Sequence, residues 1–91
     1  MTKEQLYDKL LNKFEAGQMI VAIEEMAELI QEITKSLRGK IDTSNMLEEY
    51  VDVVIMLEQV KKYYGFTDEN IEKVKSEKLK RTEQRLLLDV V

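Results

Sequence analysis

The chain contains no proline and only three glycines, and this scarcity restricts its fold more than any other feature. Proline and glycine are the residues that most often form turns and end helices. Gly17, Gly39 and Gly65 each follow a helix-like stretch, where a glycine in left-handed geometry ends a helix. The sequence therefore predicts an all-α fold. Its helices are expected at about residues 2–16, 18–38, 44–64 and 68–85.

Polar residues that cap helices stand near the expected starts. Thr2 followed by Gln5 has the pattern of a capping box for the first helix. Residues 43–45 (Thr-Ser-Asn) offer N-caps for the third helix, and Thr67 offers one for the fourth. The apolar tail, residues 86–91, has three open assignments: it continues the fourth helix, forms a short strand or packs on a partner subunit.

Composition narrows the class of protein. The length of 91 residues allows one domain, residues 1–91, with a modest core, and 44% hydrophobic with 35% charged residues is typical of a globular chain. Without Cys or His, there is no thiol nucleophile, disulfide, Cys-ligated zinc site or imidazole metal ligand. A net charge of −4 argues against nucleic-acid binding. With no signal peptide and no long apolar span, we expect a cytoplasmic protein without membrane contact.

The third predicted helix is apolar on almost every side, which indicates a central position with several neighbours. We expect a four-helix antiparallel bundle around it. Four helices of this length cannot cover such a helix fully, so the sequence predicts a homodimer or homotetramer, with residues 44–64 or the tail in the interface. The apolar residues of this helix include Met46, Tyr50, Val53, Val54, Ile55, Met56, Leu57, Val60, Tyr63 and Tyr64.

Two acidic pairs with the same spacing lie on the second and third predicted helices. Glu25 and Glu28 are three residues apart, as are Glu49 and Asp52, so each pair shares a helix face. On facing antiparallel helices the pairs would form a cage of carboxylates, which repel one another unless a cation lies between them. Oxygen ligands alone favour Mg²⁺, Mn²⁺ or Ca²⁺. Asp52 is the only charge in the run Tyr50–Leu57, so it is the member least well explained as surface charge.

The same acids also fit two plainer structural roles. The pattern Glu-x-x-Glu is common on solvated helix faces, and the chain has 18 acidic residues, so Glu25 and Glu28 alone fit ordinary surface charge. Asp52 could instead form a buried ion pair with a Lys or Arg of the fourth helix.

The two acidic segments resemble the motif of the all-α nucleoside triphosphate pyrophosphatases, and especially the small single-domain MazG-like proteins. The segments are residues 22–29 (AIEEMAEL) and 47–54 (LEEYVDVV), and residues 77–81 (EKLKR) are similar to the family's basic segment. The resemblance implies hydrolysis of nucleoside triphosphates between the α and β phosphates, on a bundle of this type. It also implies Mg²⁺ as the cofactor, with Mn²⁺ as a substitute. The implied Mg²⁺ ligands are Glu25, Glu28, Glu49 and Asp52.

The same resemblance suggests roles in catalysis. A carboxylate must activate water in a chain without His or Cys, and Glu25 or Glu28 is the expected base. Glu24 or Glu32 could take this role from just outside the ligand set.

The fourth helix is expected to bind the phosphates. Lys78, Arg81 and Arg85 lie near one helix face, and we expect Lys78 and Arg81 to bind the triphosphate. The plainer interpretation is a solvated amphipathic helix with ion pairs such as Glu77–Arg81. Candidates for contact with the base are either stacking residues or core residues: Phe14, Tyr50, Tyr63, Tyr64 and Phe66, with Asn12 and Gln18 as polar candidates.

The sequence thus predicts a magnesium-dependent nucleoside triphosphate pyrophosphohydrolase acting on NTPs or dNTPs, of which clearance of non-standard nucleotides is one form. The competing prediction is a non-enzymatic helical module, in which the acids lie on the surface and the apolar residues drive oligomerisation.

Overall fold

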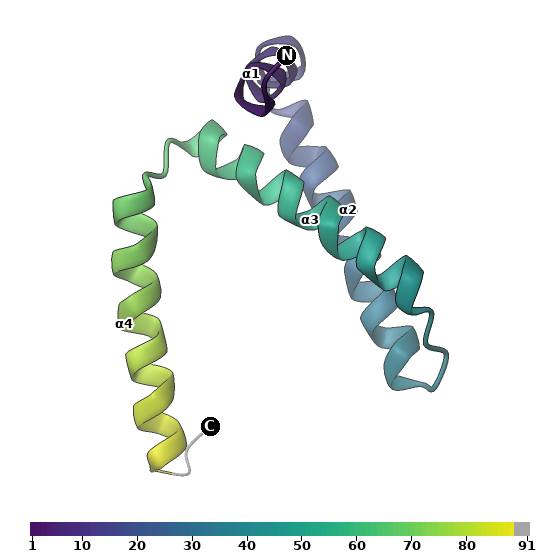
Figure 1. Ribbon diagram of the computed structural model, residues 1–91, viewed down its shortest axis with the longest axis vertical. Coiled ribbons are helices and arrows are strands. Elements are labelled where there is room, and N and C mark those ends of the chain that lie inside the picture. Colours follow the sequence, from purple (N-terminus) through teal and green to yellow (C-terminus); the bar gives the residue numbers. More distant parts are fainter. Residues whose placement is uncertain (89–91) are drawn as a thin grey trace.

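The computed structural model describes residues 1–88, which form four α-helices and no strand. The all-α class is confirmed, and each predicted helix boundary lies within two residues of the observed one. Figure 1 shows the helices in chain order. They are α1 (Lys3–Phe14), α2 (Gly17–Leu37), α3 (Thr43–Tyr64) and α4 (Asp68–Leu87).

Side-chain caps begin three of the helices. Thr2 and Gln5 form the predicted capping box, in which each side chain accepts a hydrogen bond from the backbone N–H of the other. Thr67 caps α4 as predicted. The prediction for α3 was wrong, because Asp42 is its cap and its Oδ1 accepts from the Asn45 N–H at 3.1 Å. Residue 42 still has extended backbone, whereas residues 43–45 are already helical.

Two of the three glycines end helices as predicted. Gly39 and Gly65 have φ of +85° and +73°, the left-handed geometry that glycine adopts without steric cost. Gly17 does not have this role, because it is the first residue of α2. The positive φ of that turn falls on Glu15, at +50°. The α1–α2 turn is therefore made two residues earlier than the glycine suggested.

The antiparallel pair of α2 and α3, called here the α2·α3 hairpin, holds the small core of the chain (Figure 1). Its buried apolar residues are Ala22 of α2 and Val53 and Met56 of α3. A buried polar contact joins the hairpin near its open end, where Gln18 Nε2 donates to Gln59 Oε1 at 2.8 Å. Such a contact satisfies two amides that would otherwise be costly to bury.

Helix α1 is held against α3 by one buried ring and by exposed ion pairs. Tyr7 is buried, and its hydroxyl lies 3.4 Å from Glu58 Oε1. Lys3 pairs with the same glutamate at 2.7 Å. Lys62 pairs with Glu4 at 2.8 Å and with a second acid of α1, and these contacts fix the position of α1 at the end of the hairpin far from the α2–α3 turn.

Helix α4 points away from the other three helices and, within residues 1–88, packs on none of them (Figure 1). The connection from α3 is short and locally bonded. Phe66 N–H donates to Lys61 O at 2.9 Å, Lys61 pairs with Asp68, and the Tyr64 and Phe66 rings stack with centroids 5.9 Å apart. These contacts set the direction in which α4 leaves α3.

The separation of α4 changes the expected surroundings of α3. Leu47, Tyr50 and Leu57 are exposed, so α3 is not covered on several sides within one chain. The closed antiparallel bundle and the oligomer stay predictions. Leu86 and Leu87 continue α4, in agreement with one assignment of the tail, whereas residues 89–91 lie outside the described part of the chain. Among the described residues, no helix is both long and apolar enough to cross a lipid bilayer.

Candidate functional site: an acidic cluster on the α2·α3 hairpin

The structure brings the predicted acids together. Glu25 of α2 and Glu49 and Asp52 of α3 each contribute a carboxylate oxygen, and these oxygens lie within 4.8 Å of one another. Glu28 lies close enough to Glu25 and Glu49 to alter the pKa of both. We call Glu25, Glu28, Glu49 and Asp52 the acidic cluster.

Helical spacing explains why these four side chains meet. Each helix turns by about 100° per residue, so a pair three residues apart projects from one side of its helix. Ala22 and Val53 occupy the centre of the α2·α3 contact. The two helices run in opposite directions, so both acidic pairs lie on the same side of this centre. The cluster therefore forms one edge of the α2·α3 hairpin.

Two oxygens of the cluster are buried without a hydrogen-bond partner in the part of the chain that the structure describes. They are Glu25 Oε2 and Glu49 Oε2. An acceptor in this condition costs free energy, and the cost is larger when the group carries charge. A proton or a cation would remove that cost.

The pKa values of the same two residues are shifted upward. Partial burial raises the pKa of Glu25, and the nearby charges of Glu28 and Asp52 add to the effect. Partial burial also raises the pKa of Glu49, followed by its close contact with Glu28 and then by the charges of Asp52 and Glu25. Both shifts thus have burial as their main cause and the neighbouring carboxylate charges as a further one.

The donor set fits a hard divalent cation. All four side chains present carboxylate oxygens, and three of the oxygens are already grouped closely enough to contact one ion. Glu25 and Glu49, two of the three residues so grouped, are also the two that bury an unpartnered oxygen. Glu28 and Asp52 are exposed, so the cluster is open to solvent and to a ligand on one side.

The expected apolar surroundings of Asp52 were wrong. Asp52 is exposed, and so are its neighbours Val51 and Val54. The periodicity of α3 did not reveal this, because the apolar residues around Asp52 face open surface in a single chain. The alternative ion pair with α4 is also absent from the described residues, where Asp52 has no salt bridge.

The two additional acids of α2 differ in environment. Glu24 is exposed, and its charge contributes only as the last cause of the raised pKa of Glu25. Glu32 is buried, and its Oε1 accepts from Lys35 Nζ at 3.2 Å. Glu32 therefore already has a cationic partner and is the poorer candidate for a base.

The predicted phosphate-binding residues do not meet the acidic cluster within the chain. Lys78 and Arg81 lie on α4, where they line a shallow groove of about 270 Å³ with Val74 and Glu77. The expected Glu77–Arg81 ion pair is not among the salt bridges of residues 1–88. Lys78 and Arg81 thus form no salt bridge within the described part of the chain. Their helix, α4, does not pack on the two helices that carry the acidic cluster.

The polar and aromatic candidates for base contact also have defined places. Gln18 is 8% exposed and bonded to Gln59, a residue that was not predicted to have a role. Gln59 falls three residues after the buried Met56, and this spacing was the signal for its inward position. Asn12 is exposed. The aromatic candidates are exposed rather than core residues: Phe14, Tyr50, Tyr63, Tyr64 and Phe66.

Comparison of the chain with protein-family models, with curated proteins and with solved structures gave no match.

Proposed function

We propose that the protein is a magnesium-dependent nucleoside triphosphate pyrophosphohydrolase, which converts an NTP or dNTP and water to the monophosphate and pyrophosphate. The observation that carries this proposal is the acidic cluster, in which two buried carboxylate oxygens lack partners. The sequence resemblance of the two acidic segments to the MazG-like proteins supplies the reaction. Clearance of non-standard nucleotides is one role of such an activity.

The cluster residues would hold Mg²⁺, with Mn²⁺ as a substitute. Glu25, Glu49 and Asp52 already lie at the spacing of a shared ligand set, and Glu28 adjoins them. When bound, the ion neutralises charge on the phosphate oxygens and makes an attacking water more acidic. The carboxylates offset the positive charge of the ion and leave the solvent side of the site open for the triphosphate.

A carboxylate of α2 is the proposed general base. Glu25 is half-buried within the cluster, where its carboxylate would accept the proton of a water beside the ion. Glu28 is exposed beside it and is the second candidate. In the proposed step a water oxygen bonds to the α phosphorus, the bond to the bridging oxygen of the β phosphate breaks, and pyrophosphate leaves. The proton of the water passes to the carboxylate.

Lys78 and Arg81 would bind the β and γ phosphates, since a guanidinium suits paired contacts with phosphate oxygens. Helix α4 does not reach the acidic cluster of its own chain. This role therefore requires α4 to come from another copy of the chain, or to change its position.

The proposal is tested by measuring pyrophosphate release from a panel of NTPs and dNTPs, with and without Mg²⁺. Activity should require the ion and should be lost in Asp52→Asn, which keeps the size of the side chain and removes its charge. Glu48→Gln is the matched control, because Glu48 is exposed on the same helix and outside the cluster. Absence of pyrophosphate release from every substrate, or full activity in Asp52→Asn, would show that the proposal is wrong.

The second candidate is a non-enzymatic module that assembles through its apolar surface. The exposure of residues such as Ile23, Ile30 and Leu47 favours it, because large apolar patches mark interaction sites. Thermal melting with Mg²⁺ separates the two candidates. Only the enzyme should be stabilised by the ion, since a ligand that binds the folded state raises its melting temperature.

A further inference from the structure

Helices α3 and α4 diverge from residues 65–67 like the two arms of a V (Figure 1). Within residues 1–88, α4 packs on no other helix. Its position is therefore set by the three connecting residues and the few contacts around them. A change of direction at residues 65–67 would move α4 as one body without breaking any packing between helices.

The acids of α3 and two basic residues of α4 lie at similar distances from this connection. Glu49 and Asp52 lie fifteen and twelve residues before the end of α3, which is about 22 and 18 Å along the helix. Lys78 and Arg81 lie ten and thirteen residues after the start of α4, which is about 15 and 20 Å. Closing the V would therefore bring Lys78 close to the level of Asp52. It would bring Arg81 close to the level of Glu49.

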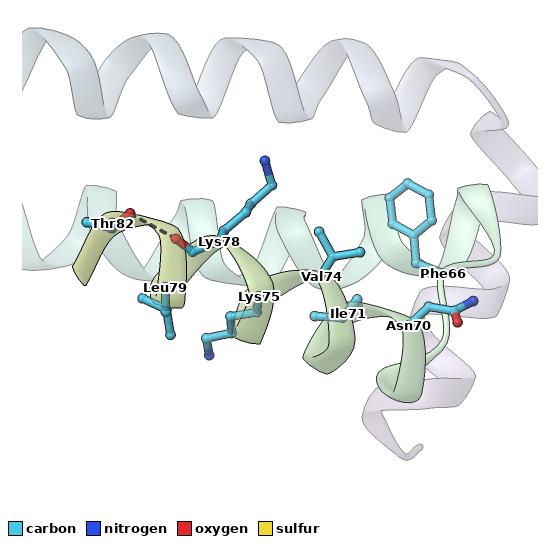
Figure 2. Close-up of a pocket in the computed structure, with 8 residues that line it drawn as sticks. All are labelled: Phe66, Asn70, Ile71, Val74, Lys75, Lys78, Leu79 and Thr82. Carbon is cyan, nitrogen blue, oxygen red and sulfur yellow. Dashed lines mark hydrogen bonds between the residues drawn. The ribbon is translucent and has the colours of Figure 1, made fainter. Parts of the chain in front are cut away.

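The two arms also carry opposite charges that lack partners among residues 1–88. Lys78 and Arg81 line one groove with Val74 and form no salt bridge. Figure 2 shows Lys78 and Val74 projecting from one side of α4 and Leu79 from the opposite side. The acidic cluster forms no salt bridge either, and it includes both buried oxygens that lack a hydrogen-bond partner.

We propose that α4 is a lid, which closes within its own chain by rotation at residues 65–67 and brings Lys78 and Arg81 to a triphosphate held at the acidic cluster. This inference rests on the proposed function and concerns how its site is closed. In the open form the triphosphate contacts one arm, and in the closed form it contacts both. It therefore binds the closed form more tightly and shifts the chain toward that form.

Few contacts oppose this movement. Lys61 pairs with Asp68 across the connection, but the Asp68 side chain is 88% exposed, and exposed ion pairs contribute little to stability. Gly65 has φ of +73°, with open space where a side chain would begin. Glycine adopts positive and negative φ without steric cost, so this residue can take up the change of direction.

The lid would respond to the number of phosphates. A triphosphate bound at the acidic cluster by its α phosphate extends its β and γ phosphates toward Lys78 and Arg81. A monophosphate has neither of these groups, so nothing holds α4 closed once pyrophosphate has left. Closure is therefore linked to the intact substrate, and reopening to the product.

The test is a distance between two spin labels, one on each arm. The chain has no Cys, so Ser44→Cys and Gln84→Cys place one label on α3 and one on α4, both at exposed residues outside the acidic cluster. An excess of unlabelled wild-type chain ensures that pulsed electron resonance reports distances within one chain. Mg²⁺ with a triphosphate that has an NH bridge between its α and β phosphates, which is not hydrolysed, should shorten the distance. Mg²⁺ with the monophosphate should leave it unchanged.

Calorimetric titration of the same triphosphate analogue separates this proposal from the proposed function. Binding without a shorter distance would overturn the lid and leave the pyrophosphohydrolase standing. Absence of both binding and pyrophosphate release would overturn both. A shorter distance that appears only without unlabelled chain would assign the approaching α4 to a second copy and would also overturn closure within one chain.

Variants of the labelled chain test which residues draw α4 inward. Lys78→Ala/Arg81→Ala should still be stabilised by Mg²⁺ but should keep the open distance when the triphosphate analogue is added. Lys80→Ala is the matched control, because it removes a positive charge from another side of α4, and it should close as the wild type does. Closure in Lys78→Ala/Arg81→Ala equal to that of the control would overturn the proposal.

Discussion

Glu25 of α2 and Glu49 of α3 each bury one carboxylate oxygen that has no hydrogen-bond partner among the described residues. The two side chains belong to one acidic cluster with oxygens less than 5 Å apart. Partial burial raises the pKa of both glutamates, and the charges of Glu28 and Asp52 add to both shifts, so the cluster is subject to repulsion in the chain without a cation.

Glu49→Gln is expected to stabilise the metal-free protein and to abolish its response to Mg²⁺. The amide removes one repelling charge and can donate to the neighbouring carboxylates, so the melting temperature should rise by a few degrees. Wild-type protein should gain stability with added Mg²⁺, whereas the variant should not. Glu48→Gln serves as the control and should behave as wild type. A lower melting temperature for metal-free Glu49→Gln would contradict the proposed repulsion.

The raised pKa values also predict a pH dependence. An unfolded glutamate titrates at about pH 4.3. In the folded chain the pKa values of Glu25 and Glu49 are higher, so the folded state binds more protons than the unfolded state between the unfolded and the folded pKa values. The two glutamates therefore contribute less to the free energy of unfolding as the pH rises from the unfolded to the folded pKa. The melting temperatures of wild type and of Glu25→Gln/Glu49→Gln should therefore converge as pH is lowered from about 7 to about 4. A constant difference across this range would exclude the two glutamates as its cause.

The buried amide pair predicts a strong coupling between α2 and α3. Gln18→Leu leaves the Gln59 amide buried without its partner and should lower the free energy of unfolding by about 1–3 kcal/mol. The double variant Gln18→Leu/Gln59→Leu should recover most of this loss, because no amide then remains unpaired. Urea unfolding at one fixed protein concentration measures all four members of the cycle. Additive losses would indicate that the hydrogen bond contributes little.

The α1–α2 turn predicts a stabilising substitution. Glu15 has φ of 50° and ψ of −126°, a geometry that glycine adopts freely and other residues adopt at a cost. Glu15→Gly should therefore stabilise the chain by about 1 kcal/mol. Ala27→Gly is the control, because Ala27 is exposed in the middle of α2 and the change should destabilise by about 0.5–1 kcal/mol. Equal effects of the two changes would argue against strain at Glu15.

Arg81→Ala tests the proposed contact with phosphate. Loss of a hydrogen bond between charged groups should raise the KM for a nucleotide by about tenfold. Lys80→Ala removes a neighbouring positive charge on another side of α4 and should change the KM little. An unchanged KM in Arg81→Ala would remove this residue from the substrate site.

The parts of the fold that follow from local signals could be predicted from the sequence. Capping residues and glycines located the helices, and the spacing of Glu25, Glu28, Glu49 and Asp52 placed their side chains together, because both patterns act within a few residues. The departure of α4 and the exposure of Asp52 could not be predicted. They depend on which surfaces pack together, and helical periodicity shows that a face is apolar without showing what covers it.

The short connection between α2 and α3 has a consequence for the order of folding. All four acids lie within two helices joined by residues 38–42, so bringing them together needs the closure of only one small loop. Loops of this size close within about 100 ns, far faster than two separate chains can meet at ordinary concentrations. The carboxylates that would hold a cation are therefore expected to assemble at a rate independent of dilution, before α4 has found a surface to pack on.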